Sequence, residues 1–422
     1  MTSRRQFLAL AGGSTGAALL AACDGRRSPA AVRPEPSGVP DRLLVDTAAG
    51  LALIRGTECQ VAGAAVPAPD GRTVYATALD GRGGTTLQLV ETISGAVMAT
   101  AVLPGRWTPR ITSGGGLVAL TPPDPAPTGL PLGPPAGRSS TPILVADRDG
   151  RRHQFDLPGN YQPDAFSQDG SRLFVLDWLP PASPDRYRVR ALHLADGTLS
   201  PLLTRDKSPV PEGAEEEMRG DGRQAVYSAL TGNLCTLYTH QPDHQHTRDL
   251  RGSGRGGDVH AFVHTLNLDA GWAYCIDLPE PFGLGPAAAH TLAVLPDGRT
   301  LLVADVTSGR LAVVDTETLT ITRVVPIPAG TGTASAVVSP DGGRLHLGCG
   351  TRLEVLDLAG AAGPTVVGGW DLDADVRGIA SSRRGERLYA GSADAVAWYD
   401  PSSGARGGRV PVAGLRELRR AV

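Results

Sequence analysis

The chain is poor in lysine, in aromatic residues and in long apolar runs. Lys207 is the only lysine among 422 residues, aromatic residues make up 5% of the chain, and the formal net charge is −3. Such mild acidity argues against nucleic acid or an anionic membrane surface as a partner. Beyond the N-terminal region, no run approaches the roughly 18 apolar residues of a membrane span. We therefore expect a globular domain without nucleic-acid partners.

Local signatures of catalysis are also absent. The sequence has no HExxH zinc motif, no DxDxDG calcium loop and no CxxC pair. It has no Gly-x-Ser-x-Gly elbow on a strand-to-helix turn, because strong helix signals are nearly absent. The glycine-rich stretch 252–257 lacks the strand–helix context of a phosphate loop. The sequence thus indicates no catalytic residue, and a non-catalytic protein is favoured.

What the chain does contain begins with an export signal. Arg4 and Arg5 form a twin-arginine signature ahead of a small, apolar run, and Cys23 follows Leu-Ala-Ala as in a lipobox. We expect residues 1–22 to be a signal peptide and Cys23 to carry a lipid that anchors the protein to the extracytoplasmic side of the cell membrane. Residues 23–40 are rich in Arg, Ser, Pro, Gly and Ala, which predicts a flexible tether. The folded domain is expected over 41–422.

The rest of the chain is a repeat of short apolar strands joined by Asp-Gly turns, as in Pro296-Asp297-Gly298. Glycine permits positive φ in such turns, and Asp bonds the local backbone. The turn glycines are Gly71, Gly114, Gly170, Gly222, Gly298, Gly342 and Gly385. A period near 43 residues with strands throughout predicts one all-β domain, a β-propeller of four-stranded blades. Seven anchors favour seven blades. An extra strand pair within 43–54 either closes the ring or belongs to an eighth, split blade.

The repeat resembles the YVTN-type, WD40-like β-propeller family. The best match is His-Thr-Leu-Ala-Val-Leu-Pro-Asp-Gly at 290–298, followed by Leu-Leu-Val-Ala at 301–304 and Leu-Ala-Val-Val-Asp at 311–315. Gly114 and Gly385 depart from the pattern because they lack the Asp, and the fourth repeat carries a long insertion. The resemblance implies a propeller that binds a ligand or partner at the cell surface, and it implies no particular reaction.

Alignment of the repeats on their turn glycines selects residues that the innermost strands send toward the central channel. The polar members, expected to form a ligand site at the channel mouth, are Arg106, Gln162, Asp164, Glu216, His290 and Arg377. His290 has an alternative role, because the repeat itself favours His there to orient a turn.

A run of three glutamates, Glu215 to Glu217, falls where the alignment expects an apolar innermost strand. At least one carboxylate must then face an interior, where it needs a cation or hydrogen-bond donors. Arg219 and Arg223 are the nearest candidates in the sequence. A structural ion pair is favoured over a catalytic or metal-binding carboxylate.

Six of the nine histidines lie between residues 240 and 290. His244 and His246 share a face if the chain is extended, and His260 and His264 are paired in the same way. Imidazoles are suitable ligands for Zn²⁺ or Cu²⁺, so these four residues are candidate metal ligands. The other interpretation is a polar insertion that caps a blade edge or recognises a partner.

Two of the cysteines, Cys235 and Cys275, fall in the same repeat of an exported chain. This makes them the preferred disulfide, with free buried thiols as the alternative.

Two classes of function remain. The favoured one is a non-catalytic, membrane-tethered propeller that binds a small ligand or a protein through its channel mouth and histidine-rich insertion, without a cofactor. The alternative is an extracytoplasmic propeller enzyme, either a metal-assisted hydrolase or lactonase or a redox-cofactor protein, with a transition metal as its cofactor and Glu216 as its base.

Overall fold

The computed structural model describes residues 38–124, 134–211, 213–219, 224–241, 244, 246 and 260–422. Arg4, Arg5 and Cys23 lie outside these residues, as do Arg223 and nearly all of the predicted tether at 23–40. No helix in the described part of the chain is long and apolar enough to cross a bilayer.

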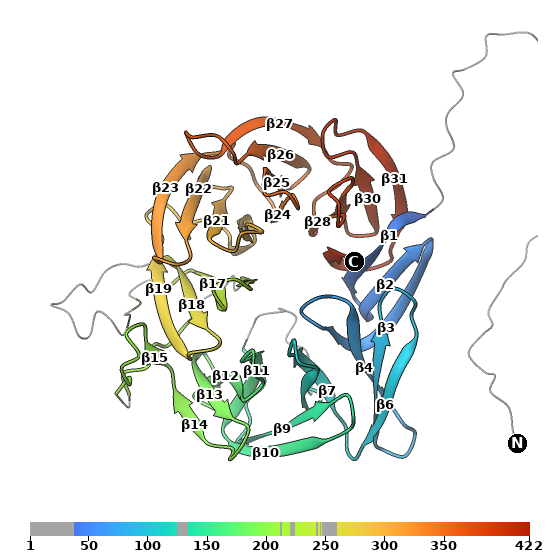
Figure 1. Ribbon diagram of the computed structural model, residues 1–422, viewed down its shortest axis with the longest axis vertical. Coiled ribbons are helices and arrows are strands. Elements are labelled where there is room, and N and C mark those ends of the chain that lie inside the picture. Colours follow the sequence, from blue (N-terminus) through green and yellow to red (C-terminus); the bar gives the residue numbers. More distant parts are fainter. Residues whose placement is uncertain are drawn as a thin grey trace, which may run out of the picture. The chain divides into compact units, whose positions relative to one another are not determined.

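The described chain is all-β, as the sequence predicts. It contains 32 strands and one short 3₁₀ helix, η1 (Ala287–Ala289). The strands form small sheets, almost wholly antiparallel, that stand in a ring with first strands such as β24 toward the centre and last strands such as β27 outside (Figure 1). This is the arrangement of a β-propeller, so the predicted fold class is confirmed.

The largest sheet has seven strands in the order β32-β1-β2-β3-β4-β5-β6. Their bounds are β1 (Val39–Thr47), β2 (Gly50–Gly56), β3 (Glu58–Pro67), β4 (Thr73–Leu79), β5 (Thr85–Glu91), β6 (Val97–Leu103) and β32 (Leu415–Ala421). Residues 58–63 of β3 pair with β2, whereas residues 64–67 pair with β4. The sheet is therefore two four-stranded units that share one continuous strand.

Six further sheets complete the ring. The next two contain β7 (Thr108–Thr112), β8 (Leu117–Thr121), β9 (Ser140–Asp147) and β10 (Arg152–Pro158), then β11 (Asn160–Phe166), β12 (Arg172–Leu179), β13 (Arg186–His193) and β14 (Leu199–Pro201). The five-stranded sheet contains β15 (Leu203–Thr204), β16 (Gln224–Ser228), β17 (Asn233–Thr239), β18 (Ala261–Asn267) and β19 (Trp272–Asp277).

The last three sheets have four strands each. They are β20 (His290–Val294), β21 (Thr300–Asp305), β22 (Arg310–Asp315) and β23 (Thr320–Pro326); β24 (Ala334–Val338), β25 (Arg344–Cys349), β26 (Arg352–Asp357) and β27 (Thr365–Asp371); and β28 (Ile379–Ser381), β29 (Leu388–Gly391), β30 (Ala395–Tyr399) and β31 (Arg406–Pro411).

Counted by pairing, the described strands form eight blade-like units rather than the seven that the sequence favours. The additional unit is split between the chain ends: β1 pairs with β32, with Leu43 opposite Ala421 and Val45 opposite Leu418. Because its strands come from opposite ends of the chain, it has no Asp-Gly anchor of its own. This matches the split blade that the sequence leaves open as the alternative.

Most of the turns form at the predicted glycines, but in two repeats the turn uses a different glycine from the one that the sequence pattern selects. At the best repeat, Gly298 has φ +69° and the Asp297 carboxylate accepts a hydrogen bond from the Arg299 N–H at 2.8 Å. In the second repeat the residue with positive φ before β8 is Gly116, not Gly114. In the insertion repeat the turn between β16 and β17 uses Gly232, whose N–H donates to the Ser228 carbonyl. The anchor Gly222 lies outside the described residues.

The predicted disulfide between Cys235 and Cys275 is wrong, because neither cysteine forms a disulfide bond. Cys235 of β17 lies opposite Thr265 of β18, whereas Cys275 of β19 lies opposite His264. Successive residues of a strand point to opposite faces, so the two thiols are on different faces of the sheet and two strands apart. Cys235 packs in the core toward β20–β22, and Cys275 packs in the core toward β12 and β13.

Candidate metal centre

The segment 213–219 carries Glu216, the carboxylate of the candidate metal centre. It is not the innermost strand that the sequence predicts, since that place is taken by β16. Instead it runs beside β13, where Met218 and Tyr187 exchange backbone hydrogen bonds. The alignment selected the wrong segment because it counted back from Gly222, whereas the turn glycine is Gly232. Eight residues before Gly232 lies Gln224 of β16, whose side chain donates a hydrogen bond to the His290 carbonyl of the next blade.

Two glutamates hold this segment on β13. Glu215, with a side chain only 5% exposed, accepts hydrogen bonds from Arg188 at 2.9 Å and from Arg190 at 2.6 Å. Glu217 pairs with Arg186 at 2.6 Å in a more exposed position. The ion-pair interpretation therefore fits both residues, although Glu215 pairs with arginines of β13 rather than with Arg219.

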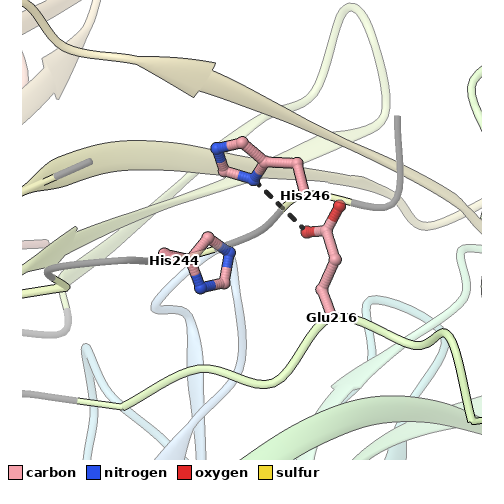
Figure 2. Close-up of side chains that lie close together, drawn as sticks. All are labelled: Glu216, His244 and His246. Atoms are coloured by element: carbon pink, nitrogen blue, oxygen red, sulfur yellow. Dashed lines mark ion pairs between the residues drawn. The ribbon is translucent and has the colours of Figure 1, made fainter. Parts of the chain in front are cut away.

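Between these two anchors, Glu216 points the other way, toward β18 and β19. The Cys275 thiol donates a hydrogen bond to its Oε2 at 3.0 Å, and Nδ1 of His246 lies 3.8 Å from the same oxygen. Donor atoms of Glu216, His244 and His246 all lie within 4.8 Å of one another (Figure 2). The same holds for Glu216, His264 and Cys275. Glu216 is therefore shared by two groups of potential metal ligands.

A second carboxylate fixes the orientation of His246. Its Nε2 lies 2.6 Å from Oδ1 of Asp277, an acceptor, so Nε2 carries a proton and donates it to this contact, while Nδ1 faces Glu216. His246 is fully buried and His244 nearly so, yet Nδ1 of His246 and Nε2 of His244 make no hydrogen bond. Two buried imidazole nitrogens thus face a carboxylate, and one of them, Nδ1 of His246, is held to it by an ion pair at 3.8 Å rather than by a hydrogen bond of normal length.

Aromatic rings form the wall behind the histidines. Phe262 stacks on His244 with ring centroids 4.4 Å apart and meets His246 edge-on at 5.1 Å. On its other side it stacks on Tyr238, whose hydroxyl accepts a hydrogen bond from Tyr187. These rings restrict the two imidazoles, which is the support that a rigid ligand set requires.

The local environment sets distinct charge states. Burial lowers the pKa of His244 to about 4, and the nearby His246 adds to this effect. Burial alone would lower the pKa of His246, but Asp277 and Glu216 outweigh it and raise the pKa to about 9. Burial likewise opposes the charge of Glu216, but His246, His264 and Cys275 outweigh it and hold the pKa of Glu216 well below its ordinary value. At neutral pH, without an ion, the centre therefore contains the Glu216 carboxylate, a neutral His244 imidazole and a protonated His246 imidazole.

A cavity of about 540 Å³ opens next to the centre. Glu216, His264 and Cys275 lie in its wall, while apolar side chains such as Val189 and Met218 make up much of the rest. The centre is thus buried on its aromatic side and accessible from the cavity.

Sequence comparisons find no relative. No protein-family profile matches the chain, and no curated protein sequence matches it.

Structural comparison finds many similar folds. Apo AztD from Citrobacter koseri superposes with a TM-score of 0.51 at 12% identity, over 90% of this chain and 97% of that one. The periplasmic gluconolactonase PpgL of Pseudomonas aeruginosa gives a TM-score of 0.44 at 18% identity, over 90% and 98%. The β-propeller domain of Swd1 from Myceliophthora thermophila gives 0.40 at 12% identity, over 73% and 87%. The fold is a β-propeller. At these identities the similarity extends to the fold alone.

The predicted channel-mouth residues are mostly outside the centre. Of the six, only Glu216 belongs to the ligand groups found in the described part of the chain. Gln162 and Asp164 lie on the first strand β11, where the Gln162 side chain accepts a hydrogen bond from the Trp178 indole. Arg377 precedes β28 and donates to the Leu415 carbonyl. Arg106 is exposed two residues ahead of β7, because the anchor of its repeat is Gly116.

His290 has the structural role that the repeat suggests. It is fully buried, accepts a hydrogen bond from the Gly283 N–H at Nε2 and lies 3.0 Å from the Pro286 carbonyl at Nδ1. Both contacts fix the loop ahead of β20. His290 therefore orients a turn in this structure.

Three of the four histidines predicted as metal ligands belong to the two ligand groups, and one does not. His244, His246 and His264 contribute to the two ligand groups, whereas His260 is in neither. The sequence interpretation missed Cys275 as a possible ligand and Asp277 as the partner of His246. A usable signal existed: Cys275 and Asp277 are two residues apart on β19, and Cys275 lies opposite His264, so all three share a face.

Proposed function

We propose that this protein is an exported β-propeller that binds a transition-metal ion at Glu216, His244 and His246, with His264 and Cys275 completing or adjoining the ligand set. The observation that carries the proposal is the pair of buried imidazole nitrogens, Nε2 of His244 and Nδ1 of His246, that face the Glu216 carboxylate without a hydrogen bond. A buried polar atom left unpaired costs about 1–3 kcal/mol. A bound cation that displaces the proton from Nδ1 of His246 removes this cost for both nitrogens at once.

The donor set favours Zn²⁺. Imidazole, carboxylate and thiolate are the three ligand types of protein zinc sites, and with bonds of about 2.0–2.3 Å a tetrahedral site spaces its donors about 3.3–3.8 Å apart. The donors here lie within 4.8 Å of one another, so small side-chain shifts suffice. The contact of His246 with Asp277 is the carboxylate–histidine pairing that typically supports a metal ligand.

Metal content and affinity test this proposal. The protein purified without chelator is expected to contain about one equivalent of zinc, and His246→Ala or Glu216→Gln is expected to lose it. His260→Ala is the matched control, because His260 is a histidine of the same region outside both ligand groups. A wild-type protein that takes up no zinc in a competition titration, or variants that bind as tightly as the wild type, would refute the proposal.

The membrane-tethered location is part of the same proposal and rests on Arg4, Arg5 and Cys23. Cys23→Ala is expected to release a folded protein from the membrane fraction. A variant that still sediments with membranes after a carbonate wash would contradict the lipid anchor.

A second candidate function follows from the 540 Å³ cavity beside Glu216. A metal site that opens to a cavity is the arrangement of hydrolytic metal centres, in which the ion activates water and a carboxylate accepts its proton. Hydrolysis of a panel of esters and lactones that disappears both on chelation and in Glu216→Gln would favour this enzyme. Metal binding without any such hydrolysis would leave the binding function alone.

A further inference from the structure

The cavity beside Glu216 lies between two neighbouring sheets. Val189 of β13 lies in one side of its wall and Ala273 of β19 in the other, and residues 202–206 contribute a further part. Its volume of about 540 Å³ is within the usual range of about 300–1,000 Å³ for small-molecule sites. The cavity is therefore large enough for an organic molecule next to the proposed zinc ion.

Most of the wall is hydrocarbon. Val189, Leu202 and Met218 belong to one buried hydrophobic cluster, and Ala273 packs against it. The carboxylate of Glu215, which also lies in the wall, is already paired with two arginines of β13. A hydrocarbon chain that enters the cavity therefore exchanges water for apolar contacts, and its binding strengthens with the apolar area that is buried.

The inner end of the cavity is continuous with the metal ligands. Ala273 and Cys275 are two residues apart on β19, and His264 lies opposite Cys275, so the three side chains share one face of the sheet. Two residues of a strand span about 7 Å. Glu216, whose side chain is 15% exposed, lies in the same wall and is the most accessible member of both ligand groups. A molecule whose head reaches Glu216 can thus extend its chain past Ala273.

The mouth of the cavity is polar but has no net charge. Arg205 and Asp206 both line the cavity and are exposed, which places them at its entrance. The Arg205 guanidinium donates hydrogen bonds to the carbonyls of Glu317 and Thr318 at 3.1 and 3.0 Å, so the turn between β22 and β23 holds it there. Because the two charges at the mouth are opposite, they select neither an anion nor a cation. The head of a ligand is therefore selected at the inner end.

We infer that this cavity binds an aliphatic carboxylic acid, whose carboxylate ligates the zinc ion and whose chain lies along the apolar wall. The inference rests on the proposed zinc site at Glu216, His244 and His246. An ion held by one carboxylate and two neutral imidazoles keeps one positive charge, and the Cys275 thiol, which donates a hydrogen bond to Glu216, adds none. A second carboxylate neutralises that charge, and its oxygen is an ordinary zinc ligand. An ammonium head would meet a like charge, and an alcohol would leave the charge uncompensated.

The test uses the mature protein loaded with one equivalent of zinc and a series of acetate, butyrate, hexanoate and octanoate. Calorimetry is expected to show an affinity that rises about fourfold for each methylene added, until the cavity is filled. Octanol and octylammonium carry the same chain with a neutral and a cationic head, and both should bind more weakly than octanoate. An affinity that does not change with chain length, or octanol or octylammonium binding as tightly as octanoate, would overturn the inference.

Ala273→Phe tests the position of the chain, because the added ring fills part of the cavity. Octanoate binding should weaken at least tenfold, whereas acetate and zinc should bind as in the wild type, which also shows that the fold is kept. Ala101→Phe is the matched control, since Ala101 is a partly exposed alanine on β6 of another sheet, and its octanoate affinity should be unchanged. Octanoate affinity that survives Ala273→Phe would contradict the inference. If this variant does not fold, the wild-type series still decides.

A zinc titration of the same wild-type sample separates this inference from the proposed function. Protein that binds no zinc would refute both. Protein that binds zinc, loses it in His246→Ala and shows no dependence on chain length would refute this inference alone.

Discussion

Nε2 of His246 lies 2.6 Å from Oδ1 of Asp277, and this contact turns Nδ1 toward Glu216. Asp277 is 41% exposed, whereas the imidazole it holds is fully buried. The pair thus connects the protein surface to the interior of the proposed metal centre. Its contribution is to orient the ring and to fix which nitrogen is available to an ion.

Asp277→Asn should therefore weaken zinc binding without removing the site. The amide keeps the size of the side chain but loses the negative charge, and losses of about 10- to 100-fold in affinity are usual for such partners. Competition with a fluorescent zinc chelator measures the affinity, and elemental analysis should still give the wild-type stoichiometry at saturating zinc. An unchanged affinity would show that Asp277 does not position His246.

Glu215→Gln should destabilise the protein. The substitution removes one of the two carboxylates that pair with Arg188 and Arg190, while Asp177 still pairs with Arg188 at 2.9 Å, so the loss should be about 1.5–3 kcal/mol, as for a hydrogen bond to a charged group. Urea denaturation measures the free energy of unfolding. Glu217→Gln is the matched control, because its pair with Arg186 is more exposed and should contribute less than about 1 kcal/mol. Equal losses in the two variants would contradict this account of the segment.

The thiols should react in an order set by burial. Burial raises the pKa of Cys235 to about 11, so at pH 8 only about one thiol in a thousand is the reactive thiolate. Cys59 is exposed. Iodoacetamide should therefore label Cys59 in the folded protein and label Cys235 only after unfolding, as peptide mass spectrometry would show. Recovery of a Cys235–Cys275 disulfide peptide would mean that the two strands are wrongly placed.

The propeller fold could be predicted from the sequence more fully than the closure of the ring or the candidate metal centre. The Asp-Gly turns and the strand period were sufficient for the propeller, because both are local signals. The closure of the ring was harder to predict, because β1 and β32 pair with each other although they lie at opposite ends of the sequence, and no turn motif connects them. Histidine enrichment located three of the potential ligands. The position of Glu216 could not be derived by alignment, because the true turn at Gly232 is ten residues beyond the glycine that the pattern selects.

Asp305 should give acid sensitivity to the blade that contains β20 and β21. Burial opposes its charge, but contacts with His290 and hydrogen bonds with Ser308 outweigh burial, so its folded pKa lies below its ordinary value. Its stabilising contribution is therefore complete above about pH 4 and is lost as the pH falls through the folded pKa. The difference in unfolding free energy between wild type and Asp305→Asn should shrink as the pH falls from 6 to about 2. A constant difference over that range would contradict the assignment.

The most direct measurement of the central claim is anomalous diffraction at the zinc edge, from crystals of the mature protein grown with one equivalent of zinc. The account predicts one strong peak, bounded by Glu216, His244 and His246 and absent in crystals of His246→Ala. A zinc-loaded crystal with its peak elsewhere, or with none at this position, would contradict it.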